Sequence, residues 1–391
     1  MGAMAFGAKS ADAVSPVVQG NTAFALDFYQ RERTQDGNLF FSPYSISTAL
    51  AMTYAGARGQ TEREMAKVLH CSVTQEELAR SFASLAERFG QIQKQKQVNL
   101  SVANSLWCER KYTFTEAFLE LNRKHFGAEV QLLDFSGHPD QSREEINAWV
   151  ERKTQNRIQN LLQPPNITPF TTLVLCNAIY FKGNWLTQFD PKATTREPFF
   201  QKTTQKAEVP MMTAELKVRS YKAKDAVLFA LPYAGNDLSM AVILPEQLDG
   251  LKAVEDSLNA PVLQEWLSAL DASSETKATI VLPKFKLNLR LELSKTLKSM
   301  GMASAFGGGA DFSGMSPSKD LSISEVVHQA FLDVNEEGTE AAAATAVVMS
   351  RLAAHVSPQL LLRADHPFLF LIRERQTGSI LFLGRLVDPT N

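Results

Sequence analysis

The side chains that carry most enzyme chemistry are scattered along these 391 residues. No G-x-S-x-G elbow, H-E-x-x-H pair or phosphate-binding loop occurs, and Gly307-Gly308-Gly309 lacks the strand-to-helix context of such a loop. A Ser-His-Asp triad brought together only by folding is the alternative left open. The six histidines show no metal-ligand spacing: His70, His125, His138, His328, His355 and His366. The sequence therefore predicts a protein that is not an enzyme and holds neither metal nor cofactor.

Composition excludes several classes of partner. The chain has a formal net charge of −2 and 45% hydrophobic residues, without the concentrated basic surface typical of nucleic-acid binders. No apolar run reaches the roughly 18 residues of a membrane span. We expect a monomer that binds neither nucleic acid nor membrane. The cysteines are odd in number and widely spaced, so we interpret them as buried or free thiols: Cys71, Cys108 and Cys176.

The N-terminus gives little information on the compartment. Residues 1–14 are interpreted as a remnant of cloning or a flexible N-terminus, and residues 15–391 as a single domain. Met1-Gly2-Ala3-Met4 resembles a cloning sequence, so a natural signal could have been removed. Localisation stays open between a secreted or extracytoplasmic protein and a cytoplasmic one.

The segment from Glu336 to Ser357 is an unusually long connector between two predicted strands, and long connectors tend to be functional. It contains no proline, so every backbone N–H from Gly338 onward could join a sheet. As a strand it would present one uncharged face: Thr339, Ala341, Ala343, Thr345, Val347 and Met349. On propensity alone, an alanine-rich helix capped by Thr339 is an equally good description.

The remaining pattern predicts an α+β fold, with helices dominating the first 160 residues and strands the rest. A buried central strand is expected at Thr171–Phe181, from an almost unbroken apolar run. Helices are expected at Ser15–Arg33, Tyr44–Ala57, after capping boxes at Thr61 and Thr74, and at Ser142–Leu162, Gly250–Leu258 and Leu291–Met300. Further strands are expected at Val98–Trp107, Val130–Phe135, Ala226–Pro232, Leu238–Pro245, Lys277–Leu289, Leu321–Val334 and Leu360–Arg363, with a terminal hairpin, Pro367–Ile372 and Ser379–Val387.

Six segments, in the same order along the chain, resemble the serpin family of serine protease inhibitors: FFSPYSISTALAM (40–52), NAIYFKGNW (177–185), ADFSGM (310–315), EEGTEAAAA (336–344), DHPFLF (365–370) and GRLVDP (384–389). The resemblance covers about residues 16–391. It implies the serpin fold, with three β-sheets, about nine α-helices and an exposed reactive-centre loop at about residues 338–357.

The resemblance also implies a mechanism, in which a protease cleaves the loop, stays attached as an acyl ester, and is trapped when the loop inserts into the central sheet. Serine proteases are the expected partners, with papain-like cysteine proteases as a further class. The expected scissile bond is Leu352–Ala353, which suits chymotrypsin, elastase or cathepsin G-like enzymes. The alternative, Arg351–Leu352, suits trypsin-like ones. The implied hinge is Glu336, Gly338, Thr339, Glu340, Ala341, Ala342, Ala343 and Ala344.

Other roles follow from the same resemblance. Ser42, Ser45, Asn177 and His328 match a buried polar cluster where the sheet opens, and Trp185 and Lys284 lie near its top, with Lys284 as partner for Glu336. A polyanion site at Arg88, Lys94 and Lys96 is outweighed by a solvated face. Asn99 and Asn166 begin glycosylation sequons. The alternative function is a non-inhibitory carrier, storage protein or chaperone. The small side chains of Thr339 and Ala341–Ala344, with no charge on the face to be buried, favour the inhibitor.

Overall fold

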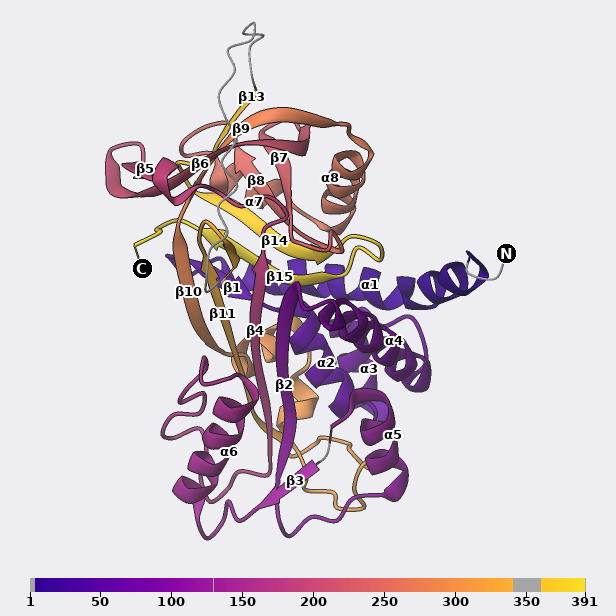
Figure 1. Ribbon diagram of the computed structural model, residues 1–391. Coiled ribbons are helices and arrows are strands. Elements are labelled where there is room, and N and C mark those ends of the chain that lie inside the picture. The colour runs from indigo at the N-terminus through magenta and orange to yellow at the C-terminus, as the bar shows by residue number, and fades with distance from the viewer. Residues whose placement is uncertain (1–3, 129, 340–359, 391) are drawn as a thin grey trace, which may run out of the picture.

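The computed structural model describes residues 4–128, 130–339 and 360–390, with side chains from residue 15 onward (Figure 1). In these ranges the chain forms nine α-helices: α1 (Met4–Glu32), α2 (Pro43–Tyr54), α3 (Gly59–Val68), α4 (Gln75–Lys94), α5 (Glu116–Phe126), α6 (Pro139–Lys153), α7 (Leu251–Ser257), α8 (Ala260–Ala272) and α9 (Ser294–Met300). The strands are β1 (Leu39–Phe41), β2 (Val98–Glu109), β3 (Val130–Leu133), β4 (Leu173–Asn184), β5 (Thr195–Lys202), β6 (Gln205–Lys222), β7 (Ala226–Pro232), β8 (Leu238–Pro245), β9 (Glu275–Pro283), β10 (Phe285–Glu292), β11 (Ile323–Val334), β12 (Gly338–Thr339), β13 (Leu360–Arg363), β14 (Phe368–Glu374) and β15 (Ile380–Leu386).

A six-stranded sheet forms the lower half of the molecule in Figure 1, in the order β10-β11-β12-β4-β2-β3. Its central strand β4 is buried on both faces, as its apolar sequence predicts. Alternate residues of β4 point to opposite sides. Leu175 and Ile179 belong to the main core with α2, whereas Val174 and Tyr180 pack in a second core with α6. Helices therefore cover this sheet on both sides.

The second sheet has nine strands, in the order β1-β15-β14-β8-β7-β6-β9-β13, with β5 paired to β6. Its long strand β6 pairs with β7 through residues 219–222 and with β9 through residues 211–219. One continuous strand thus joins what would otherwise be two sheets. The three sheets implied by the resemblance are two hydrogen-bonded networks in the described residues, because β6 belongs to both parts of the second.

Most expected elements are confirmed, and local capping explains them. Ser42 caps α2, its side chain accepting from the Ser45 N–H, with Pro43 in the first turn. Thr74 and Glu77 form the predicted capping box of α4. Helix α1 begins earlier than Ser15, at Met4. Helices α5 and α8 were not anticipated, and the expected strand Lys277–Leu289 is divided into β9 and β10.

Two helix predictions are wrong in detail. Thr61 is not a cap: α3 begins at Gly59, and the buried Thr61 hydroxyl accepts from the Asp311 N–H at 2.9 Å. Helix α6 ends at Lys153 rather than Leu162, because Gln155 and Asn156 adopt positive φ of 53° and 61°. The chain beyond is folded back onto α6, since the Asn147 side chain bonds both the N–H and the C=O of Leu162.

Within the described part of the chain, no helix is both long and apolar enough to cross a membrane.

Candidate functional site

The six-stranded sheet is divided at one end. Strands β4 and β11 run parallel and pair directly from Leu173 and Ile323 up to Tyr180 and Phe331. Above that point the short strand β12 lies between them, antiparallel to both. We call the end that contains β12 the upper end, as it is oriented in Figure 1, and the end at Leu173 the lower end. The hinge of the predicted loop has thus entered the sheet by two residues.

Glycine is required at the first inserted position. Gly338 has φ of +154°, and a Cβ there would lie 2.1 Å from the Gly183 carbonyl oxygen. Gly338 pairs with Asn184, and Thr339 with Gly183. The Thr339 side chain is fully buried, and its hydroxyl lies 2.9 Å from the Tyr233 hydroxyl. Burial raises the pKa of Tyr233, so that its hydroxyl stays protonated and available for this bond.

Trp185 holds the chain that leads into the hinge. Its indole Nε1 donates to the Asn335 carbonyl at 3.0 Å, and its backbone N–H donates to the Glu337 carbonyl at 2.9 Å. Its ring stacks on Tyr233, with centroids 4.7 Å apart. Trp185 therefore lies at the top of the sheet, as expected, and contacts both the turn and the tyrosine that binds Thr339.

Glu336 and Lys284 form an ion pair at the top of the sheet. The Lys284 Nζ lies 2.8 Å from Glu336 Oε2, and the Thr194 hydroxyl donates to Oε1 at 2.8 Å. Burial alone would raise the pKa of the Glu336 carboxyl, but the hydrogen bonds from Lys284 and Thr194 outweigh it and hold the pKa below its ordinary value. The hinge acid is consequently ionised and fixed at neutral pH.

A buried polar cluster crosses the line between β4 and β11, and it contains all four residues expected there. His328 and Asn177 are register partners on the two strands and are hydrogen-bonded through Nδ1 and Oδ1. The Asn177 Nδ2 donates to Ser45 Oγ at 2.6 Å, and Ser42 Oγ donates to the Leu381 carbonyl at 2.6 Å. Separation of the two strands must break the bond between His328 and Asn177.

The tautomer of His328 follows from its partners. The Ser42 N–H donates to Nε2 at 3.1 Å, so the proton lies on Nδ1 and is donated to Asn177. Complete burial lowers the pKa of His328 to about 3. The imidazole is therefore neutral at physiological pH and serves as a structural link. The hydroxyls of Ser42 and Ser45 bond to the Leu381 carbonyl and to Asn104, so neither is activated by His328.

Three residues of the site were missed in the sequence. Asn104 lies opposite Asn177 on β2, and its Oδ1 accepts from Ser45 Oγ at 3.1 Å. Tyr233 and Thr194 come from segments far from the hinge in sequence. The alternation of apolar and polar residues predicted that Asn104 lies on a strand. Only the order of the strands in the sheet shows that Asn104 faces the cluster.

Part of the predicted site lies outside the described residues. This holds for Glu340 and Ala341, Ala342, Ala343 and Ala344 of the hinge, and for Arg351, Leu352 and Ala353 at the expected cleavage point.

Two weaker candidates are explained by structural contacts. Arg88 forms an ion pair at 2.9 Å with Glu374, whose side chain has no exposed surface. The positive charge of Arg88 is therefore balanced within the protein. The Asn166 amide is buried, donating to Glu292 and accepting from the Gln163 N–H. A glycan on this amide would disrupt those bonds, whereas Asn99 is partly exposed.

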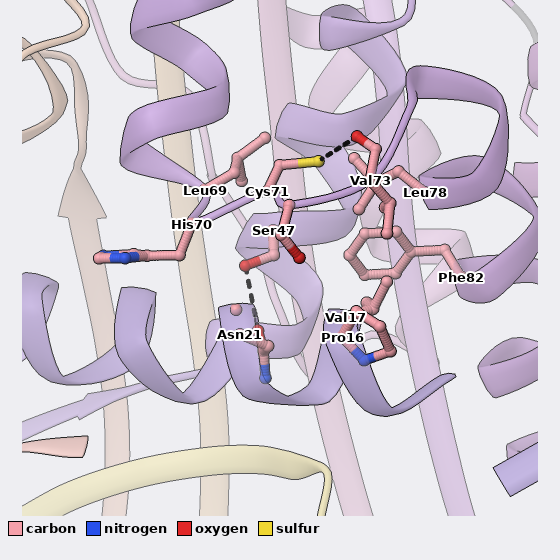
Figure 2. Close-up of a pocket in the computed structure, with 12 residues that line it drawn as sticks. Pro16, Val17, Asn21, Ser47, Leu69, His70, Cys71, Val73, Leu78 and Phe82 are labelled. Atoms are coloured by element: carbon pink, nitrogen blue, oxygen red, sulfur yellow. Dashed lines mark hydrogen bonds between the residues drawn. The ribbon is translucent and has the colours of Figure 1, made fainter. Parts of the chain in front are cut away.

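The thiols are in unreactive surroundings. Cys71 lines a small pocket between α1, α2 and the segment after α3, where its Sγ donates to the Val73 carbonyl at 3.2 Å (Figure 2). Burial raises the pKa of the Cys71 thiol, and does so for Cys108 and Cys176 as well. His70 points away from the pocket in Figure 2 and instead lies 2.7 Å from Asp27. Nothing here resembles an activated nucleophile.

Comparisons with known proteins agree with this geometry. The family model described as serpin (serine protease inhibitor) matches residues 19–389. Human serpin B3 is 39% identical over 387 residues, covering 95% of this chain and 99% of its own. Leukocyte elastase inhibitor of Sus scrofa is 40% identical over 380 residues, covering 94% and 98%. Among solved structures, Serpin48 of the insect Tenebrio molitor is similar with a TM-score of 0.85 and 31% identity, covering 95% and 98%.

Proposed function

This chain belongs to the serpin family, and from that premise we propose that it inhibits serine proteases as a suicide substrate. The protease's serine Oγ attacks a carbonyl carbon in the segment 340–359, the C–N bond breaks, and the departing amine takes the proton. The acyl ester that remains ties the protease to the loop. The loop then enters the sheet and carries the protease with it. The observation that supports this proposal most directly is β12, which already occupies the first two positions between β4 and β11.

The register of β12 sets how far insertion can proceed. Gly338 pairs with Asn184 and Thr339 with Gly183. Each further inserted residue would pair one position lower on β4, so that residue 349 would reach Leu173, the first residue of β4. In an inserted strand, every second residue counted from Thr339 would lie on the same buried face as Thr339. These residues have small or apolar side chains, and Glu340 would lie on the opposite face.

Insertion would replace one set of hydrogen bonds between paired strands with two sets. The parallel pairing of β4 with β11 is lost, and the inserted strand pairs antiparallel with both neighbours. The net gain is one ladder of on the order of ten hydrogen bonds, each worth roughly 0.5–1.5 kcal/mol. The sum is on the order of 10 kcal/mol, which is comparable to the stability of a whole domain. This is enough to deform an attached protease, provided insertion is faster than ester hydrolysis.

We place the scissile bond at Leu352–Ala353, with Arg351–Leu352 as the alternative. The test is incubation with chymotrypsin, elastase, trypsin and papain, followed by denaturing gels and mass spectrometry of the released C-terminal fragment. Leu352 predicts a covalent complex with chymotrypsin or elastase and a fragment that begins at Ala353. Arg351 predicts a complex with trypsin and a fragment that begins at Leu352. Simple clipping by every protease favours the carrier, storage or chaperone function instead.

The variant Thr339→Arg sharpens the test, because it places a charge at a fully buried hinge position beside Tyr233. We expect loss of the covalent complex and conversion to a clipped substrate. Thr339→Ser keeps the hydroxyl and should keep the complex. If Thr339→Arg forms as much complex as the unaltered protein, insertion is not the mechanism. We also propose that the free inhibitor is a monomer, which size-exclusion chromatography with light scattering checks.

A further inference from the structure

The turn before β4 presents an exposed aromatic ring. Phe170 has 91% of its surface exposed, more than any other large hydrophobic residue in the described part of the chain. Its neighbour Pro169 is also exposed. Scattered exposed leucines are ordinary on protein surfaces, but a phenylalanine with almost no contact to its own protein is costly to leave in water. The ring is therefore a candidate for contact with a partner.

Hydrogen bonds constrain the backbone of the turn that carries this ring. The Thr168 N–H donates to Thr171 Oγ1 at 2.9 Å, the Thr171 N–H donates to the Thr168 carbonyl at 3.0 Å, and the Phe170 N–H donates to Thr168 Oγ1 at 3.3 Å. Thr171 itself is buried. An aromatic side chain on a constrained backbone binds with little loss of conformational entropy, which is the property of an interface anchor.

The register of the hinge points to the same turn. If the proposed insertion continues the pairing of Gly338 with Asn184, residue 352 comes level with Phe170 on the β4 side. On the β11 side, where Thr339 pairs with Val334, the same extension brings residue 352 level with Leu321. Both ladders end near residue 349, so only three residues, about 10 Å of extended chain, separate the end of the sheet from Leu352. Cleavage after Arg351 would shift this by one residue, to the level of Thr171.

We propose that Phe170 is the docking point for the protease in the trapped acyl complex, an inference that rests on the proposed function. With so short a tether, the protease attached to Leu352 is pressed against the turn 168–171 at the lower end of the sheet. Phe170 packs against the apolar surface of the protease beside its acylated serine. It is a positioning residue, since it restrains the protease after transfer and takes no part in the attack on the loop.

The experiment uses chymotrypsin and four forms of the full-length inhibitor: unaltered, Phe170→Ala, Phe170→Trp and Leu186→Ala. Leu186 is a matched control, because it is 52% exposed but follows Trp185 at the upper end. All four should form the complex at the same association rate. The purified Phe170→Ala complex should release active chymotrypsin about tenfold faster, the factor expected for loss of one buried aromatic contact. Phe170→Trp and Leu186→Ala should match the unaltered protein.

Photo-crosslinking tests the contact itself. Benzoylphenylalanine in place of Phe170 should cross-link chymotrypsin in the complex but not in a mixture with an inactivated chymotrypsin, whereas the same group in place of Leu186 should not cross-link in the complex. An unchanged release rate for Phe170→Ala, or no cross-link from position 170, overturns the inference while leaving the proposed function intact. If the unaltered protein forms no complex with chymotrypsin but forms one with trypsin, the same four forms are compared with trypsin. If it forms a complex with neither protease, the proposed function fails and the inference falls with it.

Discussion

The two ends of the six-stranded sheet differ in how β4 and β11 are joined. At the upper end the strands are separated by β12, and their contacts pass through Thr339, Tyr233 and Trp185. At the lower end they pair directly, and Thr172 bridges them, its hydroxyl donating to the Ser322 carbonyl at 2.5 Å and its N–H donating to Ser324 Oγ at 2.9 Å.

The difference indicates where the strands would begin to separate in the proposed insertion. A strand inserted from the upper end would first occupy the positions where β4 and β11 are already separated. It would then have to break the hydrogen bond between His328 and Asn177, and finally the bridge at Thr172. The polar groups along this line are satisfied while the strands are paired, so each step must replace their hydrogen bonds. In the proposed mechanism, the closed lower part is thus the barrier to insertion, and the open upper part is its starting point.

Removal of the glycine at the open end should have the largest effect. In Gly338→Ala the new Cβ would lie 2.1 Å from the Gly183 carbonyl oxygen, so β12 must leave the sheet or deform it. We expect a loss of about 3 kcal/mol in the free energy of unfolding, measured by urea denaturation. Hydrogen exchange at the amides of Gly183 and Asn184 should also become faster.

Gly307→Ala is the control for this change, because its Cβ would meet no atom within 4 Å and its φ is not positive. It should leave stability within about 0.5 kcal/mol of the unaltered protein. Equal stability of the two variants would show that β12 is not held at the position described.

Acid should lower the free energy of unfolding because of His328, which lies where β4 and β11 pair directly. Burial lowers its pKa to about 3 in the folded state, whereas the unfolded value is about 6.5. Below about pH 6.5 the unfolded chain therefore binds a proton that the folded chain does not, and stability falls by about 1.4 kcal/mol per pH unit until about pH 3. Above pH 6.5 this contribution is complete and constant.

His328→Gln isolates this effect from other titrating groups. Between pH 7 and pH 4.5 the unaltered protein should lose about 2–3 kcal/mol more than the variant, as measured by denaturant unfolding at each pH. Parallel pH profiles for the two proteins would contradict a neutral, buried His328.

The smallest effect is expected at the lower bridge. Thr172→Val removes the hydroxyl that donates to the Ser322 carbonyl, and should cost about 1 kcal/mol. Thr172→Ser keeps the hydroxyl and serves as the control. Hydrogen exchange of the amides of Leu173 and Ile323 should become faster in the valine variant only. Equal exchange in both variants would mean that the bridge does not contribute to closing this end.

Local signals made much of the fold predictable. The caps at Ser42 and Thr74 and the apolar run of β4 involve residues close in sequence, and these elements were found where expected. Thr61 was misassigned because its hydroxyl is used by Asp311, a residue from a distant segment. The end of α6 depends on Asn147 bonding Leu162, which no periodicity reveals.

The site was predictable to a similar extent. The contact of Lys284 with Glu336 and the grouping of His328 with Asn177 followed from the family resemblance, and both contacts are present. Asn104 and Tyr233 could not be found in the same way, because each is an ordinary strand or bridge residue until strand order places it beside the cluster or the hinge. The entry of Gly338 and Thr339 is likewise a property of the folded sheet.

The nine-stranded sheet has a consequence for biosynthesis. Strand β15 is made long after β1, yet it lies between β14 and β1 in the sheet. Until β14 and β15 have been synthesised, β8 lacks its partner β14 and β1 lacks its partner β15. Each strand then has an unpaired edge, which can pair with a strand of another chain. Completion of this half of the molecule must wait until β15 has been made, so a truncation that removes β15 should leave an aggregating product.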